Sequence, residues 1–352
     1  MNQMDEILAV LLLVMLPAAF GWALLVLWRK VRAAVSPVRW PQVALGNVLL
    51  LACLLSLAFL GGEIYVRGCY DTTDSLGYTK VSERWVRRHW QINAATCRDN
   101  IQYYPALAAG KRRVTLLGDS FTAGHGVKNV EDRFANRLRA AHPEWEVHAL
   151  AQPGYETIDE INILKACLEN RYQLDLVVLV YCLNDISDLV PEWNAAREQI
   201  YSDVDRAGWF KNSSYFYNLL YHRFKAARNP WMKDYFQFVR DTAAGPIWDQ
   251  QQERLASLQK LIEANGGRLV VVTFPFLHAV GTDYQFHNVH AALDRYWSEH
   301  RVPHLDLLSV YEKLPSAQIT VNRYDAHPNE YAHRLAAEAM DQFLRPYLSP
   351  VK

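Results

Sequence analysis

The sequence predicts an α/β protein with a parallel sheet between two layers of helices, preceded by a hairpin of two transmembrane helices. Two long apolar runs lie near the N-terminus, short strand-like apolar runs follow residue 110, and helical stretches separate those runs. Strands that alternate with helices favour a parallel sheet covered on both faces. We accordingly divide the chain into a hairpin (residues 1–62), an extracytoplasmic connector (63–110) and an α/β domain (111–352).

The two apolar runs are long enough to cross a bilayer. Ile7 to Trp28 would extend over about 33 Å as a helix, and Gln42 to Gly62 has a similar length. The loop between them has no acidic residue and is basic, with Arg29, Lys30, Arg32 and Arg39. The positive-inside rule places this loop in the cytoplasm, so we expect everything after Gly62 to be periplasmic.

Two alternatives to this hairpin can be weighed. A cleaved signal peptide needs a basic start and a shorter apolar core, whereas Asp5 and Glu6 precede the first run here. One true span followed by a buried or interfacial helix is the other alternative. The sequence favours the hairpin, with membrane lipid as its partner.

Composition narrows the remaining function classes. Lysine plus arginine and aspartate plus glutamate both number 37, so the formal net charge is zero. The composition therefore gives no indication of the basic surface that nucleic-acid binding requires. No cysteine or histidine spacing indicates a metal, and we expect no cofactor. Cys69 and Cys97 flank a polar stretch where an oxidising compartment would allow a disulfide, but spacing alone leaves their pairing open.

The α/β domain shows five strand candidates. They are Val114–Leu117, Val147–Leu150, Leu174–Tyr181, Arg268–Thr273 and a weaker one at Pro303–Leu307. Leu174–Tyr181 is apolar on both faces, as a strand covered on both sides would be. An amphipathic helix at Glu330–Leu344 closes the domain.

An aromatic-rich insertion at about 187–249 interrupts the alternation of strands and helices. Insertions of this length are typical of lids and binding elements. Its aromatic side chains could form a sugar-stacking or acyl-binding surface, or they could build a small core of their own. We favour the second explanation for most of them.

Polar motifs follow three of the strands and precede the last helix. Gly118-Asp119-Ser120 ends the first strand, Gly154 follows the second, Asn184-Asp185 follows the third, and Asp325-Ala326-His327 precedes the closing helix. Each has an ordinary explanation as a turn, a helix cap or a polar loop. Ligands bind at the carboxyl edge of parallel strands, however, and all the motifs together in this order indicate one site.

In this order the motifs resemble the SGNH/GDSL hydrolase family over roughly residues 112–345. The resemblance implies that Ser120 is the nucleophile, His327 the general base and Asp325 the residue that orients it. It also implies an oxyanion hole formed by the backbone N–H groups of Ser120 and Gly154 and the side-chain amide of Asn184. Asp119 and Asp185 would then be structural.

Two departures from the family pattern affect these roles. Cys182 occupies a place where the family usually has glycine, which should alter packing rather than chemistry. The family usually separates its acid from its histidine by three positions, and Tyr324 stands there, whereas Asp325 lies only two before His327. If Asp325 does not reach the imidazole, Asp306 is the reserve acid.

The predicted function is a membrane-anchored, extracytoplasmic serine esterase acting on O-acyl groups through an acyl-enzyme, with O-acetyl groups of a cell-envelope or secreted polysaccharide as the leading substrate. An acyltransferase with the same site is an alternative, because both reactions pass through an acyl-enzyme. A lipid esterase or thioesterase, and a non-catalytic assembly module with this fold, are the others.

Overall fold

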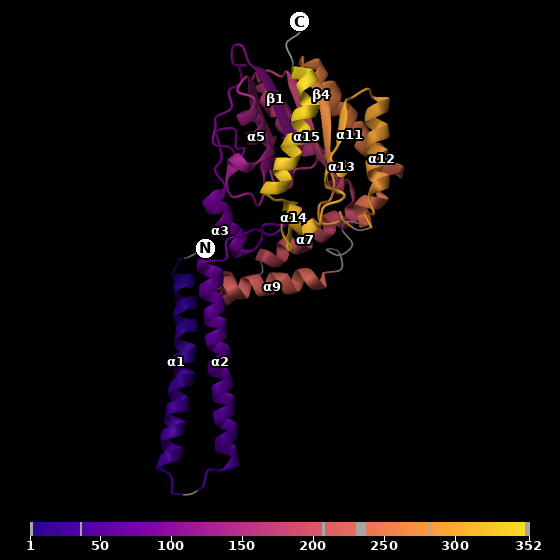
Figure 1. Cartoon of the computed structure of the whole chain (residues 1–352). Helices are drawn as coiled ribbons and strands as arrows, with labels where there is room; N and C mark the ends of the chain where they lie inside the picture. The colour runs from indigo at the N-terminus through magenta and orange to yellow at the C-terminus, as the bar shows by residue number, and fades with distance from the viewer. Residues whose placement is uncertain (1–2, 36, 206–207, 230–236, 282, 349–352) are drawn as a thin grey trace. The chain divides into compact units, whose positions relative to one another are not determined.

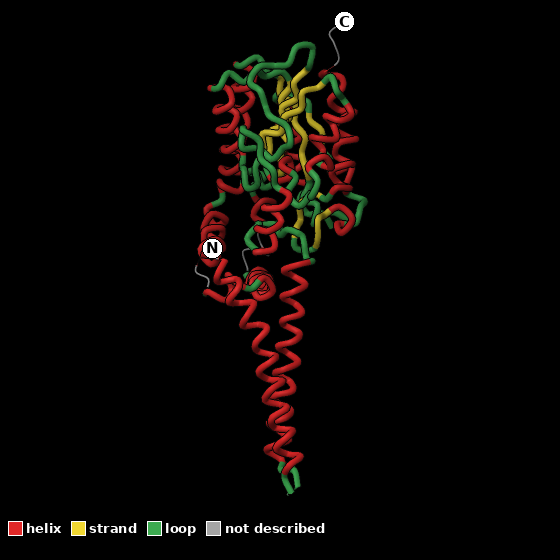
Figure 2. Tube along the Cα trace, turned by 90° about the vertical axis from the view of Figure 1, so that its left-hand side faces the viewer, coloured by secondary structure: helices red, strands yellow, loops and turns green. Residues whose placement is uncertain are grey.

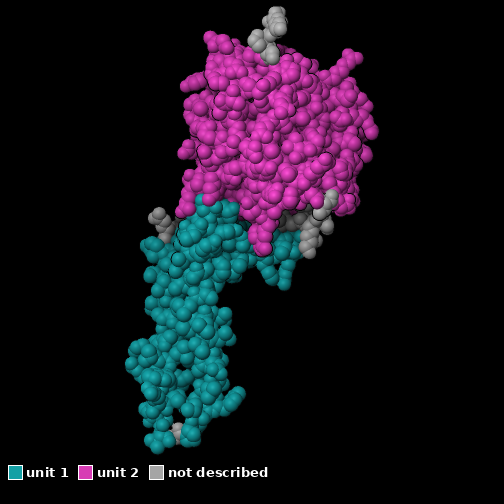
Figure 3. Space-filling model, viewed as in Figure 1, with its two compact units in different colours: residues 1–72, 78–84, 201–229 teal, residues 73–77, 85–200, 230–352 magenta. Residues whose placement is uncertain are grey.

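The computed structural model describes residues 3–35, 37–205, 208–229, 237–281 and 283–348. The chain forms two compact units, coloured separately in Figure 3. Unit 1 comprises Met1–Thr72, Tyr78–Arg84 and Tyr201–Asn229, and unit 2 comprises Thr73–Gly77, Trp85–Ile200 and Pro230–Lys352. Both the connector and the aromatic insertion are therefore shared between the two units.

Unit 1 contains two long apolar helices that lie side by side, α1 (Gln3–Ala33) and α2 (Trp40–Gly68) (Figures 1 and 2). Their mean hydropathies of 2.6 and 2.5 over an 18-residue window and their lengths are sufficient for crossing a membrane. Their leucine and valine side chains are largely exposed, unlike those of a core helix. Such exposure is what contact with lipid requires.

Two further helices of unit 1 come from the aromatic insertion, α8 (Trp209–Ser213) and α9 (Tyr215–Arg228). The helix α3 (Lys80–His89) contributes its first residues to this unit. A small apolar cluster joins these elements to the end of α2 and consists of Val66, Val81, Tyr215 and Leu219. Tyr215 and Leu219 of the insertion thus lie in a small core that they share with α2, whereas Trp209, Tyr217 and Phe224 are exposed.

Unit 2 confirms the predicted fold class. Its five-stranded parallel sheet has the order β2-β1-β3-β4-β5. The strands are β1 (Arg112–Gly118), β2 (Trp145–Ala151), β3 (Leu176–Cys182), β4 (Arg268–Phe274) and β5 (His304–Asp306). Every residue of β3 is buried, because helices cover both faces of the sheet (Figure 1).

The helices of unit 2 connect and cover these strands. They are α4 (Ser120–Ala123), η1 (Val130–Asp132), α5 (Phe134–Ala141), α6 (Thr157–Glu169), η2 (Ser187–Leu189), α11 (Gly245–Ala264), α12 (His287–Glu299), α13 (Leu308–Tyr311), α14 (Ser316–Ile319) and α15 (Glu330–Leu348). The helix α7 (Pro191–Asp205) begins in unit 2 and ends in unit 1.

The sequence did not predict the short antiparallel pair β6 (Thr320–Asn322) and β7 (Asp325–Pro328). Strands of three or four residues are too short to show a readable alternation of apolar and polar side chains. The segment around His327, which the sequence indicates only as a polar loop before the last helix, is therefore a strand.

Strand order fixes where the site forms. The chain passes from β1 to β2 on one side and then returns to β3 on the other, so the strand order reverses at β1. In open α/β sheets such a reversal leaves a crevice at the carboxyl ends of the strands. Ser120, Gly154 and Asn184 each follow one of these three adjacent strands.

The two cysteines considered for a disulfide are unpaired in the structure. Cys69 is exposed at the end of α2, whereas Cys97 is buried in the apolar core of unit 2. Burial also raises the pKa of the Cys97 thiol to about 11, which disfavours the reactive thiolate.

Candidate active site

The turn after β1 presents Ser120 at the beginning of α4. Asp119 caps this short helix and accepts a hydrogen bond from the Phe121 amide at 2.8 Å. Gly124 ends the helix with a φ of 74°, a left-handed conformation that glycine adopts without strain. The sequence Gly-Asp-Ser-x-x-x-Gly thus forms a tight strand–turn–helix connection with the serine at its exit.

His327 lies between the Ser120 hydroxyl and the Asp325 carboxylate. Its Nε2 is 2.8 Å from Ser120 Oγ, and its Nδ1 is 2.5 Å from Asp325 Oδ1. The carboxylate favours the tautomer with the proton on Nδ1, which leaves Nε2 to accept the serine proton. A nucleophile, a base and an orienting acid connected in this way are able to carry out acyl transfer.

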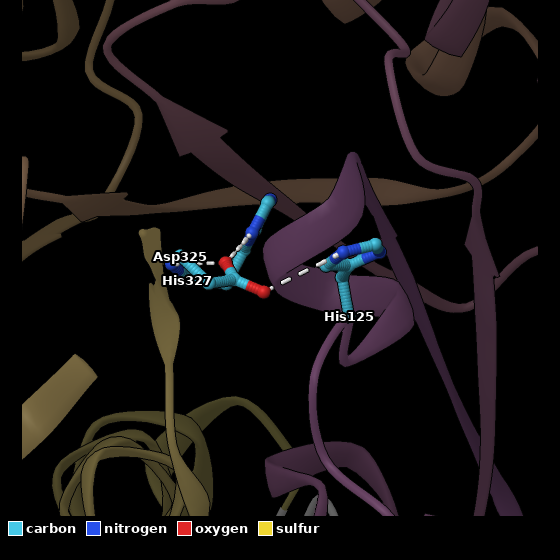
Figure 4. Close-up of side chains that lie close together, drawn as sticks. All are labelled: His125, Asp325 and His327. Atoms are coloured by element: carbon cyan, nitrogen blue, oxygen red, sulfur yellow. Dashed lines mark hydrogen bonds and ion pairs between the residues drawn. The ribbon is translucent and has the colours of Figure 1, made fainter. Parts of the chain in front are cut away.

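The second carboxylate oxygen of Asp325 contacts residues that sequence reasoning missed. The Thr73 hydroxyl donates to Oδ2, and His125 Nε2 lies 3.6 Å from the same oxygen. Figure 4 shows His125 and His327 on either side of the carboxylate. His125 Nε2 also lies 3.1 Å from the Asp74 carbonyl oxygen, to which it can donate.

Thr73, which contacts Asp325, belongs to the connector, and His125 belongs to the loop that follows Ser120. His125 lies five residues after the serine, so its position in the motif was a usable signal. Nothing in the sequence indicated Thr73, because a single threonine 252 positions from Asp325 forms no recognisable local motif with it. The connector segment is held against β7 by the Ala326 amide, which donates to Ser75 Oγ at 3.0 Å.

The electrostatics suit proton transfer. Burial raises the pKa of Asp325, but the charge of His327 and its hydrogen bond outweigh burial, so the pKa lies well below its usual range. Burial lowers the pKa of His327, but the Asp325 charge and hydrogen bond outweigh it and the net shift is upward. Burial lowers the pKa of His125 to about 4, so this imidazole is neutral.

Among the described residues, His125, Asp325 and His327 are also the group whose ligand atoms lie within 4.8 Å of one another, as a metal site would require. Both ring nitrogens of His327 are already within hydrogen-bonding distance of Ser120 and Asp325. We therefore interpret Asp325 and His327 as an orienting acid and its base, with the neutral His125 imidazole beside them.

The structure brings Gly154 and Asn184 to the ends of the strands that flank β1. Gly154 is exposed in the turn after β2, with a φ of 81°. Asn184 is half-buried in the turn after β3, and its side chain hydrogen-bonds to Asp119. Both placements agree with an oxyanion hole shared among three strand ends, and that role is part of our proposal below.

Buried carboxyl groups support these turns. Asp185 Oδ2 accepts from the Cys182 amide at 2.9 Å, so this acid closes the turn that carries Asn184. Glu160 on α6 is fully buried, and neither carboxyl oxygen has a hydrogen-bond partner among the residues that the structure describes. Burial and then the Asp119 charge raise the pKa of Glu160, while burial and then Glu160 raise the pKa of Asp185. Glu160 and Asp185 therefore keep their protons at pH values well above those at which carboxyl groups usually lose them.

The reserve acid has a different partner. Asp306 Oδ2 lies 2.8 Å from His290 Nδ1, and Oδ1 accepts from the Leu308 amide at 2.8 Å. These bonds fasten the end of β5 to α12 and α13. The acid beside His327 is Asp325.

Arg98 of the connector supports the loop after the nucleophile. Its guanidinium donates to the carbonyl oxygens of Gly124 and Val127 and lies over the rings of Trp85 and Trp90. Because His125 lies within this loop, Arg98 helps to hold the imidazole beside Asp325.

Comparison with known proteins identifies a family match for this chain. The sequence model of the GDSL-like lipase/acylhydrolase family matches residues 116–335. No curated protein is significantly similar to the chain.

The chain is also similar to several solved structures at low sequence identity. A G-D-S-L family lipolytic protein from Veillonella parvula is 14% identical, with 66% of this chain and 97% of that one covered and a TM-score of 0.41. The esterase EstA from Pseudoalteromonas sp. is 14% identical, with 68% and 99% covered and a TM-score of 0.41. The extracellular lipase from Streptomyces rimosus is 13% identical, with 66% and 99% covered and a TM-score of 0.41. The family match extends over most of unit 2, and the chain therefore belongs to the GDSL-like lipase/acylhydrolase family, whose members are carboxylic ester hydrolases.

Proposed function

We propose that this protein is a membrane-anchored serine esterase of the periplasm that removes O-acyl groups, and specifically O-acetyl groups, from a cell-envelope or secreted polysaccharide. The observation that carries the esterase chemistry is the hydrogen-bonded series Ser120–His327–Asp325. The long apolar helices α1 and α2 support the anchor. The basic loop between them supports the periplasmic side, where acylated polysaccharides are found.

The proposed reaction begins when Ser120 Oγ attacks the ester carbonyl while His327 Nε2 takes its proton. The oxyanion is stabilised by the backbone N–H groups of Ser120 and Gly154 and by the Asn184 amide. For this, Asn184 turns from Asp119 toward the substrate. His327 then gives this proton to the sugar oxygen as the bond between that oxygen and the carbonyl carbon breaks, so the sugar leaves with a free hydroxyl and the acyl group stays on Ser120. Water activated by the same imidazole releases the acid and restores the serine.

Two measurements test this function. A fluorophosphonate probe should label the wild-type protein at Ser120 and leave Ser120→Ala unlabelled. Acetate release from acetylated polysaccharides should then exceed fatty-acid release from lipids. Preferential release of fatty acids would contradict the substrate while leaving the esterase chemistry intact. Transfer of acetyl to a sugar acceptor, without free acetate, would instead identify an acyltransferase.

Topology is tested separately with reporter fusions. A reporter that is active only in the periplasm should be active when fused after Lys352 and silent when fused between Lys30 and Arg39. The reverse pattern would overturn the periplasmic location without bearing on the chemistry of Ser120.

A further inference from the structure

The helix α9 of unit 1 is fastened to the end of α2 by one buried acid. Glu63 accepts hydrogen bonds from the Ser214 hydroxyl at 2.7 Å and from the Tyr215 and Phe216 amides at 3.1 and 2.8 Å. These groups form the N-terminus of α9, where the helix dipole and unpaired amides favour a negative charge. As a result α9 runs across the axis of α2 rather than along it (Figure 1).

An unbroken series of aromatic rings continues from the apolar part of α2 along α9. Phe59 on α2 contacts the rings of Phe210 and Phe216 at 6.3 and 5.1 Å between centroids. Phe210 contacts Tyr217 at 5.5 Å, and Tyr217 is 6.4 Å from Tyr221. This series places one side of α9 at the depth of Phe59.

Gly62 permits this close approach. A Cβ atom there would lie 2.7 Å from the Phe216 ring, which is closer than non-bonded carbons can come. The missing side chain lets α9 press against α2 one helical turn beyond Phe59.

The two faces of α9 differ in the way expected for a helix at an interface. Its buried face packs in the small core and consists of Tyr215, Asn218, Leu219 and His222. Tyr217, Leu220 and Phe224 recur on the opposite face at helical spacing and are 38%, 44% and 55% exposed. Tyr217 belongs both to this exposed apolar stripe and to the series of rings that continues from Phe59.

The length of α2 up to Phe59 and the basic charge of the segment 209–228 both indicate that α9 lies at a bilayer surface. From Trp40 to Phe59 the helix α2 rises about 30 Å, the thickness of a hydrocarbon core, so Phe59 would lie at its outer boundary. The segment 209–228 contains no acidic residue and carries Lys211, Arg223, Lys225 and Arg228. Aromatic stripes bordered by basic residues are typical of helices that lie in the plane of the interface.

We propose that α9 is an interfacial helix, with Tyr217, Leu220 and Phe224 among the upper acyl chains of the bilayer and Lys225 and Arg228 beside the headgroup phosphates. The proposal requires that α1 and α2 span the membrane, but it is independent of the esterase activity. The segment would add apolar contact with lipid and fix the depth at which the hairpin sits.

Photocrosslinking of the full-length protein in vesicles tests this placement. p-Benzoylphenylalanine is introduced in turn at Tyr217, Phe224, Leu57 and Tyr331, and lipid adducts are counted by mass spectrometry. Leu57, 49% exposed within α2, is the positive control for the span. Tyr331 on α15 is the matched control, because it is 38% exposed, as Tyr217 is.

We expect adducts at Tyr217 and Phe224 at least tenfold above those at Tyr331 and comparable to those at Leu57. Adducts at Leu57 alone would overturn the interfacial helix while leaving the span intact. Absence of adducts at Leu57 as well would overturn both. Melting temperatures measured for each variant ensure that only folded protein is compared.

A second arm tests the contact with phosphates. Adducts at Phe224 should rise when phosphatidylglycerol replaces part of the phosphatidylcholine, because Lys225 and Arg228 attract the anionic surface. The double variant Lys225→Gln, Arg228→Gln should lose that rise. An equal yield in both lipid mixtures for the wild-type sequence would contradict the headgroup contact.

Discussion

The Asp325 carboxylate and the His327 imidazole lie on the same side of β7, with Oδ1 2.5 Å from Nδ1. Successive side chains of a strand point to opposite faces, so residues two apart share one. A spacing of two positions, which looked too short for an orienting acid in a loop, is therefore suitable in a strand. The His327 backbone amide also donates to Asp325 Oδ1 at 3.1 Å and holds the carboxylate in place.

Replacing this acid should impair turnover more than folding. Asp325→Asn removes the charge that stabilises the imidazolium and allows the wrong tautomer, so kcat should fall by about 10⁴-fold. Asp306→Asn should change kcat per folded molecule little, because Asp306 bonds to His290. Steady-state kinetics beside melting curves checks both variants. A larger loss of kcat in Asp306→Asn would show that the acids are wrongly assigned.

The pH dependence of kcat/KM should reflect the pKa of His327, the proposed general base. His327 must be neutral to accept the serine proton, so activity should rise with pH through its pKa, which Asp325 raises. Without the charge of Asp325 the imidazole loses its proton at lower pH. The acidic limb of Asp325→Asn should thus move to lower pH even though the maximum rate falls. A limb that stays in place or moves upward would contradict the coupling of the two residues.

The nucleophile and the oxyanion donor should behave differently. Ser120→Ala should abolish turnover and probe labelling, because no acyl-enzyme forms. Asn184→Ala keeps the serine but removes one donor, so kcat should fall by roughly 10²–10³-fold with KM little changed.

A further comparison distinguishes a catalytic from a structural Asn184. Adding Asn184→Ala to Ser120→Ala should cost much less than the product of the single losses, since the two act as a unit. If Asn184 only supports its turn, Asn184→Ala would lower the melting temperature and leave kcat per folded molecule nearly unchanged.

Thr73 should act through Asp325 as a positioning residue. Thr73→Val keeps the shape of the side chain but removes the hydroxyl that donates to Oδ2, and kcat should fall about tenfold, the equivalent of one hydrogen bond. A carboxylate with one donor fewer holds the imidazolium proton more strongly, so the acidic limb should move to higher pH. Thr73→Ser retains the donor and should restore both. A fall in kcat with an unmoved limb would assign Thr73 a packing role only.

Local pattern in the sequence was sufficient for several features of this protein. The apolar runs that form α1, α2 and the strands are long enough to be recognised without any tertiary information. The order of strands and helices predicted the parallel sheet. The motifs predicted that Ser120 and Asn184 lie close together, because the carboxyl ends of parallel strands meet at one edge of the sheet.

Tertiary structure decided the contacts between distant segments. Thr73 and Asp325 are 252 positions apart, and no local pattern relates them. The choice between Asp325 and Asp306 depended on a strand too short to recognise. The packing of α9 against the hairpin involves Glu63, an acid on α2 that accepts hydrogen bonds from the Ser214 hydroxyl and the Phe216 amide. Hydrogen bonds need their atoms within about 3 Å, and only the packing of the whole chain brings such residues that close.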